Sequence, residues 1–276
     1  MIKVLVCFTT VPQMELLSED EWSSGCRSGI IDTSGLRQEL NSFDESALEL
    51  TCRFADDAAS MGLYISKNAV TIGSRASEQL LKTIAALGFT HTDRICCENP
   101  ETLDSESAAR ILKEYILESE SFDLIIMGSQ GSPGNSRQTP FMLSEALGFH
   151  CISQVTRYQP IDERSLRICH TLDGGECTED LLYPAVLTIG TVASTYLRVP
   201  TLRDRMKVPK DRIRQIPISD FSSYASNTSE STGEHMPKLE SFRYLIDKRK
   251  AEIIHGTADE QAQMLLQRLI SDRTGI

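Results

Sequence analysis

The stretch FDLIIMGSQGSPGNSRQTP, residues 122–140, decides the fold of this protein. Its first six residues are almost continuously apolar, which indicates a strand buried in a sheet. At its other end, Thr139 is a natural helix N-cap and Pro140 a natural first helical residue. A long loop with three glycines lies between them. A strand that runs through a glycine-rich loop into a helix is typical of the ligand-binding edge of an α/β protein.

Strand-like and helix-like stretches alternate from the N-terminus to this loop. Apolar runs predict strands at Lys3–Phe8, Ala69–Ile72 (or from Leu63), Arg94–Cys97 and Phe122–Met127. Helical spacing predicts a helix capped by Asn41, one through Leu80, Ile84 and Leu87, one from Ala108 to Ile116, and one at Pro140–Leu147. The segment Pro12–Leu40 is interpreted as irregular. This alternation predicts a doubly wound, Rossmann-like parallel sheet with helices on both faces.

Such a sheet binds its ligand beyond the carboxyl ends of its strands, where the strand order reverses. This rule selects three places, Cys7–Thr10, Ile72–Arg75 and Gly128–Thr139.

The second half of the chain predicts an antiparallel β extension. The expected strands are Ile152–Tyr158, Ser165–Leu172, Cys177–Leu182 and Ala185–Thr191. The sequence Asp173-Gly174-Gly175 predicts a tight turn, because glycine supplies the positive φ that a reversal needs.

We expect one α/β domain over residues 1–221 and a C-terminal arm over residues 222–276. Ser222–His235 is rich in serine, threonine, asparagine and glycine, which is typical of a flexible linker. Beyond it, Ala258–Ile270 predicts a short amphipathic helix. Its apolar stripe must be buried on the chain's own body or on a partner chain.

The composition argues against several function classes. A net charge of −11 and an acidic isoelectric point disfavour a nucleic-acid binder and a membrane-surface protein, because both depend on cations. No apolar run is long enough for a membrane span, and the apolar start Met1–Phe8 is interpreted as a strand, not a signal peptide. The 8 cysteines include no CxxC pair, so we expect no metal site and reduced thiols in a cytoplasm.

The loop Gly128–Thr139 is the strongest candidate site. Its glycines let successive N–H groups converge, and the helix N-terminus that follows adds about half a positive charge. These features predict a phosphate site, with further donors from Ser129, Ser132, Ser136, Thr139 and Arg137. The alternative interpretation is a surface loop with capping residues. We find no GxSxG elbow and no histidine in a partner pattern, so bond-making catalysis is not expected.

Four motifs follow one another along residues 1–217. They are Lys3–Phe8 with Val11-Pro12, NSFDESALE at 41–49, GSQ at 128–130 with QT at 138–139, and DGG at 173–175 with PAVLT at 184–188. In this order they resemble the beta subunit of electron transfer flavoprotein. The second is similar to that family's Asn-Pro-Phe-Asp-Glu-x-Ala-x-Glu, the third to its Gly-x-Gln…Gln-Thr nucleotide loop, and the fourth to its Asp-Gly-Gly…Pro-Ala-Val-x-Thr segment.

The resemblance implies a heterodimer in which an alpha subunit holds the electron-carrying FAD against this chain. It also implies that this chain holds AMP, or a second FAD, in its own domain. Carried over by position, the nucleotide contacts are Cys7, Asn41, Ser42, Phe43, Asp44, Ile72, Gly128, Ser129, Gln130, Gly131, Ser132, Pro133, Gly134, Asn135, Ser136, Arg137, Gln138 and Thr139. The other role open to Asn41 is that of a helix cap.

The family also has a loop that docks a flavin-dependent dehydrogenase through a leucine in a Thr-Leu-x-x-x-Met sequence. Thr201–Met206 matches that pattern, which makes Leu202 the candidate anchor. The alternative is a leucine that covers the core beneath an irregular segment.

The chain also departs from the family pattern. Ser42 replaces the motif's proline, Arg137 stands in a loop that is usually acidic, the lysine run after Met206 is thinned, and Glu15–Gly29 is an unusual insert. We therefore expect a divergent electron-carrier subunit, with the redox step carried by flavin. The alternative is a stand-alone adenine-nucleotide-binding or sensing protein of similar fold.

Overall fold

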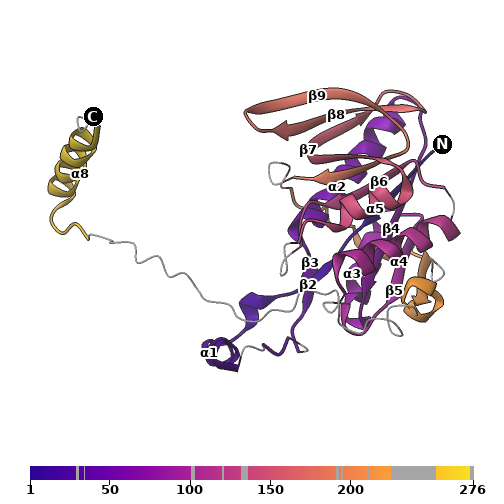
Figure 1. The fold of residues 1–276 in the computed structure, drawn as a ribbon, viewed down its shortest axis with the longest axis horizontal. Coiled ribbons are helices and arrows are strands. Elements are labelled where there is room, and N and C mark those ends of the chain that lie inside the picture. Colours follow the sequence, from indigo (N-terminus) through magenta and orange to yellow (C-terminus); the bar gives the residue numbers. More distant parts are fainter. Residues whose placement is uncertain are drawn as a thin grey trace. The chain divides into compact units, whose positions relative to one another are not determined.

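Among the residues that the structure describes, nine strands form one sheet at the centre of the larger unit of the chain (Figure 1). The structure is a computed structural model and describes residues 1–28, 31–33, 35–100, 103–119, 121–131, 136–190, 193, 195–209, 212–224 and 253–273. The chain divides into two units, Met1–Thr232 and Gly233–Ile276, which are considered one at a time.

The sheet is parallel over most of its width and antiparallel at one end. In spatial order its strands are β11 (Ile213–Pro217), β5 (His91–Cys96), β4 (Ile65–Gly73), β1 (Ile2–Cys7), β6 (Leu124–Gly128), β10 (Ala185–Ile189), β7 (His150–Pro160), β8 (Ser165–Leu172) and β9 (Gly175–Leu182). Every pairing from β11 to β7 is parallel, and β7, β8 and β9 pair antiparallel. The predicted fold class, a doubly wound α/β sheet with an antiparallel extension, is confirmed.

Helices cover both faces of the parallel part and bury one core on each side. The first core lies under α2 (Ser42–Ser60) and α3 (Glu78–Ala86), where Phe54 and Leu81 pack with Val6 of β1. The second core lies under α4 (Ser105–Glu118) and α5 (Thr139–Leu147), where Ile111 and Leu143 pack with Ile125 of β6. Two of the expected apolar positions differ by one residue, since Leu81 and Ala109 are buried in place of Leu80 and Ala108.

The expectation that β10 is antiparallel was wrong. This strand lies between β6 and β7 and pairs parallel with both. All of its five residues are buried. A continuous buried run is typical of a central parallel strand, so the composition of β10 favoured the parallel arrangement. The position of β10 directly after the β8–β9 hairpin suggested an antiparallel one instead. The turn between β8 and β9 is confirmed, with Gly174 at a φ of 93°.

The segment expected to be irregular contains regular structure. A short antiparallel pair, β2 (Thr10–Pro12) and β3 (Gln38–Leu40), flanks the helix α1 (Glu19–Ser28). Ser18 and Glu21 begin this helix with a reciprocal cap. The backbone N–H of Ser18 donates to the Glu21 carboxylate at 2.8 Å, and the Glu21 N–H donates to Ser18 Oγ at 3.3 Å. The Ser-x-x-Glu capping box at residues 18–21 was the sequence signal that predicts this helix.

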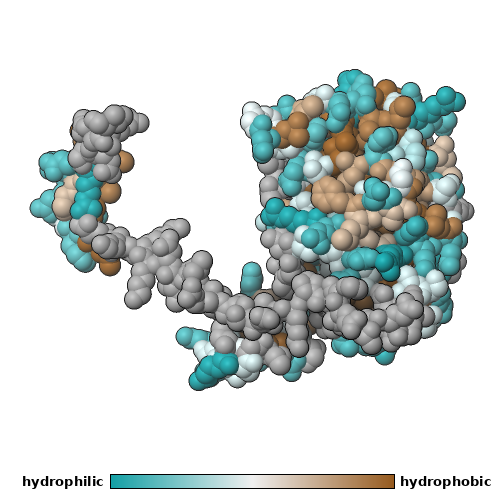
Figure 2. All heavy atoms as spheres, viewed as in Figure 1, coloured by the Kyte–Doolittle hydropathy of each residue, from teal (hydrophilic) through white to brown (hydrophobic). Residues whose placement is uncertain are grey.

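The smaller unit contains α8 (Ala258–Arg273), close to the predicted bounds. Its Leu265, Leu266 and Leu269 side chains are all more than half exposed. Figure 2 shows apolar residues gathered along one side of this helix and polar residues along the other. On the larger unit the same view shows apolar and polar residues interspersed. The expected linker lies outside the described residues from position 225 onward.

No helix among the described residues is long and apolar enough to cross a membrane.

Candidate functional site

The carboxyl ends of β1 and β6 meet where the winding of the sheet reverses. β1 pairs with β4 on one side and with β6 on the other, all in parallel. Doubly wound sheets bind their ligands in the crevice beyond such a point. The residues that follow β1, the residues that follow β6 and the first turn of α2 are brought together here.

Asp44, in the first turn of α2, joins the two strand ends. Its Oδ2 accepts the backbone N–H of Thr9, beyond β1, at 2.9 Å. Its Oδ1 accepts the backbone N–H of Gly128, at the end of β6, at 2.7 Å. Asn41 Nδ2 donates to the same Oδ2 at 3.0 Å. One buried carboxylate therefore holds both edges of the crevice and the helix that closes it.

The electrostatics of this carboxylate are set by its burial. Asp44 is 5% exposed. Burial raises its pKa to about 6, and the hydrogen bonds from Asn41, Thr9 and Gly128 limit that rise because they favour the charged form. Burial, together with the nearby Asp44 carboxylate, also raises the pKa of the Cys7 thiol. Both effects favour the neutral thiol form of Cys7.

Asn41 occupies the N-cap position of α2, as expected, but its side chain makes no capping hydrogen bond. Its Nδ2 donates across the crevice to the carbonyl oxygen of Gln130 at 2.8 Å. Its Oδ1 is buried and has no hydrogen-bond partner among the described residues. The side chain therefore fastens the start of the loop after β6 to α2.

Gly128 is required by the closeness of α2. A Cβ at this position would lie 2.5 Å from Asp44 Oδ1 and 2.7 Å from the Cβ of Phe43. Such approaches do not occur between real atoms, so any other residue would push the first turn of α2 away from β6.

The loop after β6 uses its first two amides inside the protein. The Gly128 N–H donates to Asp44, and the Ser129 N–H donates to the carbonyl oxygen of Ile189 at 3.0 Å. These two N–H groups are therefore not available to a phosphate. Predicted contacts Ser132, Pro133, Gly134 and Asn135 lie outside the described residues.

The far end of the loop is exposed and leads into α5. Ser136, Arg137 and Gln138 are exposed, and Arg137 has a φ of 57°. Thr139 was expected to cap α5 but is its first residue, and the capping position belongs to Gln138, whose side chain makes no capping bond. No acidic residue stands in the first turn of α5, so this helix end retains its attraction for anions.

The other predicted contacts differ in how far they are exposed. Cys7 and Ser129 are buried, Phe43, Ile72, Gln130 and Gly131 are half-buried, and Ser42 is exposed. Cys7 belongs to the core under α4 and α5, and Ile72 packs against that core. Thr9 lies in the predicted place Cys7–Thr10 but was not named as a contact, because a backbone N–H carries no residue-specific signal.

Leu202 opens the short helix α6 (Leu202–Met206) and is 75% exposed. The alternative that it covers the core is therefore wrong. Thr201 and Asp204 form a capping box, with Thr201 Oγ1 accepting the Asp204 N–H at 3.2 Å and the Thr201 N–H donating to the Asp204 carboxylate at 3.0 Å. The segment expected as a loop is thus partly helical, and the Leu202 side chain faces solvent.

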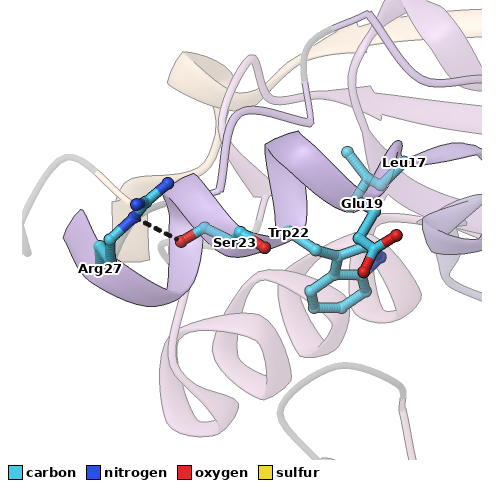
Figure 3. Close-up of a pocket in the computed structure, with 5 residues that line it drawn as sticks. All are labelled: Leu17, Glu19, Trp22, Ser23 and Arg27. Atoms are coloured by element: carbon cyan, nitrogen blue, oxygen red, sulfur yellow. Dashed lines mark hydrogen bonds between the residues drawn. The ribbon is translucent and has the colours of Figure 1, made fainter.

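Two hollows lie away from the crevice. One is an open depression on α1, where Trp22 and Glu19 lie beside Leu17 and Arg27 donates to the Ser23 carbonyl oxygen (Figure 3). The other is a cleft of about 410 Å³ between α3 and the segment that leads into β11. Neither contains a predicted site residue.

Comparison with known proteins gives one consistent result. The model of the family described as electron transfer flavoprotein domain matches residues 28–221. A protein named putative electron transfer flavoprotein subunit YgcR, from Escherichia coli strain K12, is 27% identical and covers 99% of both chains. A probable electron transfer flavoprotein subunit beta from Saccharomyces cerevisiae is 26% identical over 80% of this chain and 86% of its own. The match includes the Asn41–Asp44 turn and the whole loop after β6.

Proposed function

We propose that this chain, which belongs to the electron transfer flavoprotein family as a divergent beta-type member, is one subunit of a heterodimeric electron carrier. An alpha-like subunit completes the pair and holds FAD against this chain. The pair relays electrons from a flavin-dependent dehydrogenase to an acceptor, in the cytoplasm. When bound, the flavin supplies the redox step, and this chain supplies position and electrostatics.

The observation that carries the proposal is the closure of the Asn41–Asp44 turn onto the loop after β6. The similarity to the family's motifs involves two segments far apart in sequence, and the bonds from Asp44 to Gly128 and from Asn41 to Gln130 join them. A motif shared with a family is more informative when its separate parts form one site.

The residues of the crevice fit an adenosine monophosphate group. Asn41 Oδ1 is buried and has no partner among the described residues, and because such an acceptor is rare and costly it favours a ligand donor at this place. The start of α5, with Arg137 and Gln138 exposed beside it, suits a phosphate. We therefore assign an AMP, or the corresponding part of a second FAD, to Asn41, Gln130, Gly131 and the residues from Ser132 to Thr139.

The exposed Leu202 supports a docking role. An apolar side chain that is 75% exposed at the start of a capped helix suits a contact with another protein. We assign this contact to the dehydrogenase.

The test is purification of this chain together with an alpha-like subunit, followed by denaturation and chromatography of the released cofactors. We expect a heterodimer that releases FAD together with AMP or a second equivalent of FAD. Replacing Gly131 and Gly134 by Val should remove the nucleotide held by this chain and leave the FAD held with the alpha subunit. A flavin-free homodimer would overturn the carrier and support a stand-alone nucleotide-binding protein.

A further inference from the structure

The segment that precedes Leu202 is fastened along the outer side of α2. The backbone N–H of Thr195 donates to Ser46 Oγ at 3.1 Å, and Ser46 Oγ donates to the Thr195 carbonyl oxygen at 3.2 Å. The backbone N–H of Leu197 donates to the Glu45 carboxylate at 3.1 Å. Backbone groups of this segment are therefore satisfied by side chains of α2, where a neighbouring strand would ordinarily pair with them.

Glu49, one turn further along α2, makes the strongest of these contacts. Its Oε2 accepts the backbone N–H of Arg198 at 3.0 Å and Arg198 Nε at 3.1 Å, and its Oε1 accepts Arg198 Nη2 at 3.1 Å. Arg53 Nε donates to the same Oε1 at 3.0 Å, and Arg198 Nη1 reaches Asp56 Oδ2 at 2.8 Å. The planar guanidinium matches a carboxylate in two-point contact, which fixes orientation as well as distance.

The Glu49 side chain is shielded from solvent, so this contact differs from an ordinary surface ion pair. It is 6% exposed, against 51% for Asp180 in its pair with Arg167 on β8 and β9. Burial raises the pKa of Glu49, but the bonds from Arg198 and Arg53 outweigh that effect and hold its pKa below the ordinary value. The carboxylate therefore stays charged, and its attraction for Arg198 is screened less than that of an exposed pair.

The side of this segment that does not contact α2 carries exposed apolar side chains. Tyr196 is 89% exposed and Val199 is 80% exposed, and they precede Leu202 (75% exposed) and Met206 (79% exposed) along the chain. Several exposed apolar side chains in one stretch of chain suit a contact with another protein. The bonds to α2 occupy the inner side of residues 195–198 and leave Tyr196 and Val199 outside.

We infer that Glu49, acting through Arg198, is a positioning residue for partner docking, and that Tyr196 and Val199 extend the docking surface of Leu202. The inference rests on the proposed function and names the partner as the dehydrogenase. Glu49 itself does not contact the partner. It fixes the orientation in which the apolar side chains are presented, so that docking does not have to order the segment first.

The first turn of α2 also provides Asp44, which joins the ends of β1 and β6. Asp44 and Asp56 are twelve residues apart on α2, about 18 Å along the axis. The position of the docking segment is therefore fixed relative to the nucleotide crevice by one rigid element.

Two variants and one control test the inference in the purified heterodimer. Glu49→Gln keeps the shape of the side chain and removes the charge, and Arg198→Lys keeps the charge and removes the two-point contact. Asp180→Asn is the control, since it breaks the exposed Arg167–Asp180 ion pair on β8 and β9, which shares no residue with the segment or with α2. Each protein is measured by hydrogen exchange of the Leu197 and Arg198 amides and by steady-state reduction with the dehydrogenase that reduces the wild-type heterodimer.

Both variants should exchange these two amides faster than the wild type. Both should also raise KM for the heterodimer by about tenfold, equivalent to about 1.4 kcal/mol of docking free energy, with kcat unchanged. Direct chemical reduction of the flavin should be unaffected in each, and the control should match the wild type throughout. Faster exchange with an unchanged KM would overturn the inference, as would unchanged exchange. A wild-type heterodimer that no dehydrogenase reduces would instead overturn the proposed function, and that result is visible before any variant is made.

Discussion

The Asp44 carboxylate and the backbone N–H of Gly128 are joined by a 2.7 Å hydrogen bond that fastens the first turn of α2 to the end of β6. The two residues are 84 positions apart in the sequence. Their contact closes the crevice at the reversal of strand order and depends on the absence of a side chain at Gly128. Four predictions follow from this contact and from the surfaces of the two units.

The charge of Asp44 should make stability depend on pH. Its pKa in the folded chain, about 6, lies above the ordinary 3.8, so the folded chain binds this proton more tightly than the unfolded chain. The contribution is fully present below about pH 4 and is lost as the pH rises through about 6. The unfolding free energy of the wild type relative to Asp44→Asn should therefore fall by up to about 3 kcal/mol across this window.

Urea unfolding of both proteins between about pH 4 and about pH 7 measures this difference. Asp180→Asn is the control, because Arg167 holds the pKa of Asp180 below its usual value and any dependence on pH should have the opposite sign. A difference between wild type and Asp44→Asn that is constant over the range would contradict the prediction.

Replacing Gly128 by Ala should separate α2 from β6. The new Cβ would stand 2.5 Å from Asp44 Oδ1 and 2.7 Å from the Cβ of Phe43. We expect a loss of about 1–3 kcal/mol in unfolding free energy, as for overpacked cores, together with lower nucleotide content. Gly175→Ala is the matched control, because nothing lies within 4 Å of its Cβ position. Equal stability of the two variants would show that α2 is not seated on Gly128.

Leu202→Ala should weaken docking without affecting the fold. Because the side chain is 75% exposed, its removal should change the melting temperature little. KM for the heterodimer in reduction by the dehydrogenase should rise by about tenfold, as for a docking hot spot. Leu182→Ala, at another leucine that is 66% exposed, is the control. Loss of the heterodimer in Leu202→Ala would make Leu202 a subunit-interface residue instead.

Deleting residues 233–276 should weaken association with the alpha-like subunit. The three leucines of the α8 stripe are more than half exposed within their own unit, so a partner is expected to cover them. Association measured by sedimentation should weaken, and the melting temperature of this chain alone should stay unchanged. An unchanged affinity together with a lower melting temperature would assign the arm to the chain's own body.

The elements that depend on local pattern were predicted well. Apolar runs located β1, β4, β5 and β6, and helical spacing located α2 through α5, because burial of one face imposes its period on the sequence. The capping box before α1 was overlooked, although Ser18 and Glu21 stand at the spacing that specifies it. The parallel pairing of β10 could not be derived in this way, since the residues of a strand do not by themselves specify which strands pair with it.

The positions along the chain of β1, β4, β5 and β6, of α2 to α5 and of the glycine-rich loop were determined by the sequence itself, since each depends on residues that are neighbours along the chain. The tertiary structure alone decided that Asp44 takes the first amide of that loop, that Asn41 reaches Gln130, and that Glu49 holds Arg198. The physical reason is that a hydrogen bond needs two groups within about 3 Å. Between residues 84 to 149 positions apart, only the packing of α2 on the sheet sets that distance.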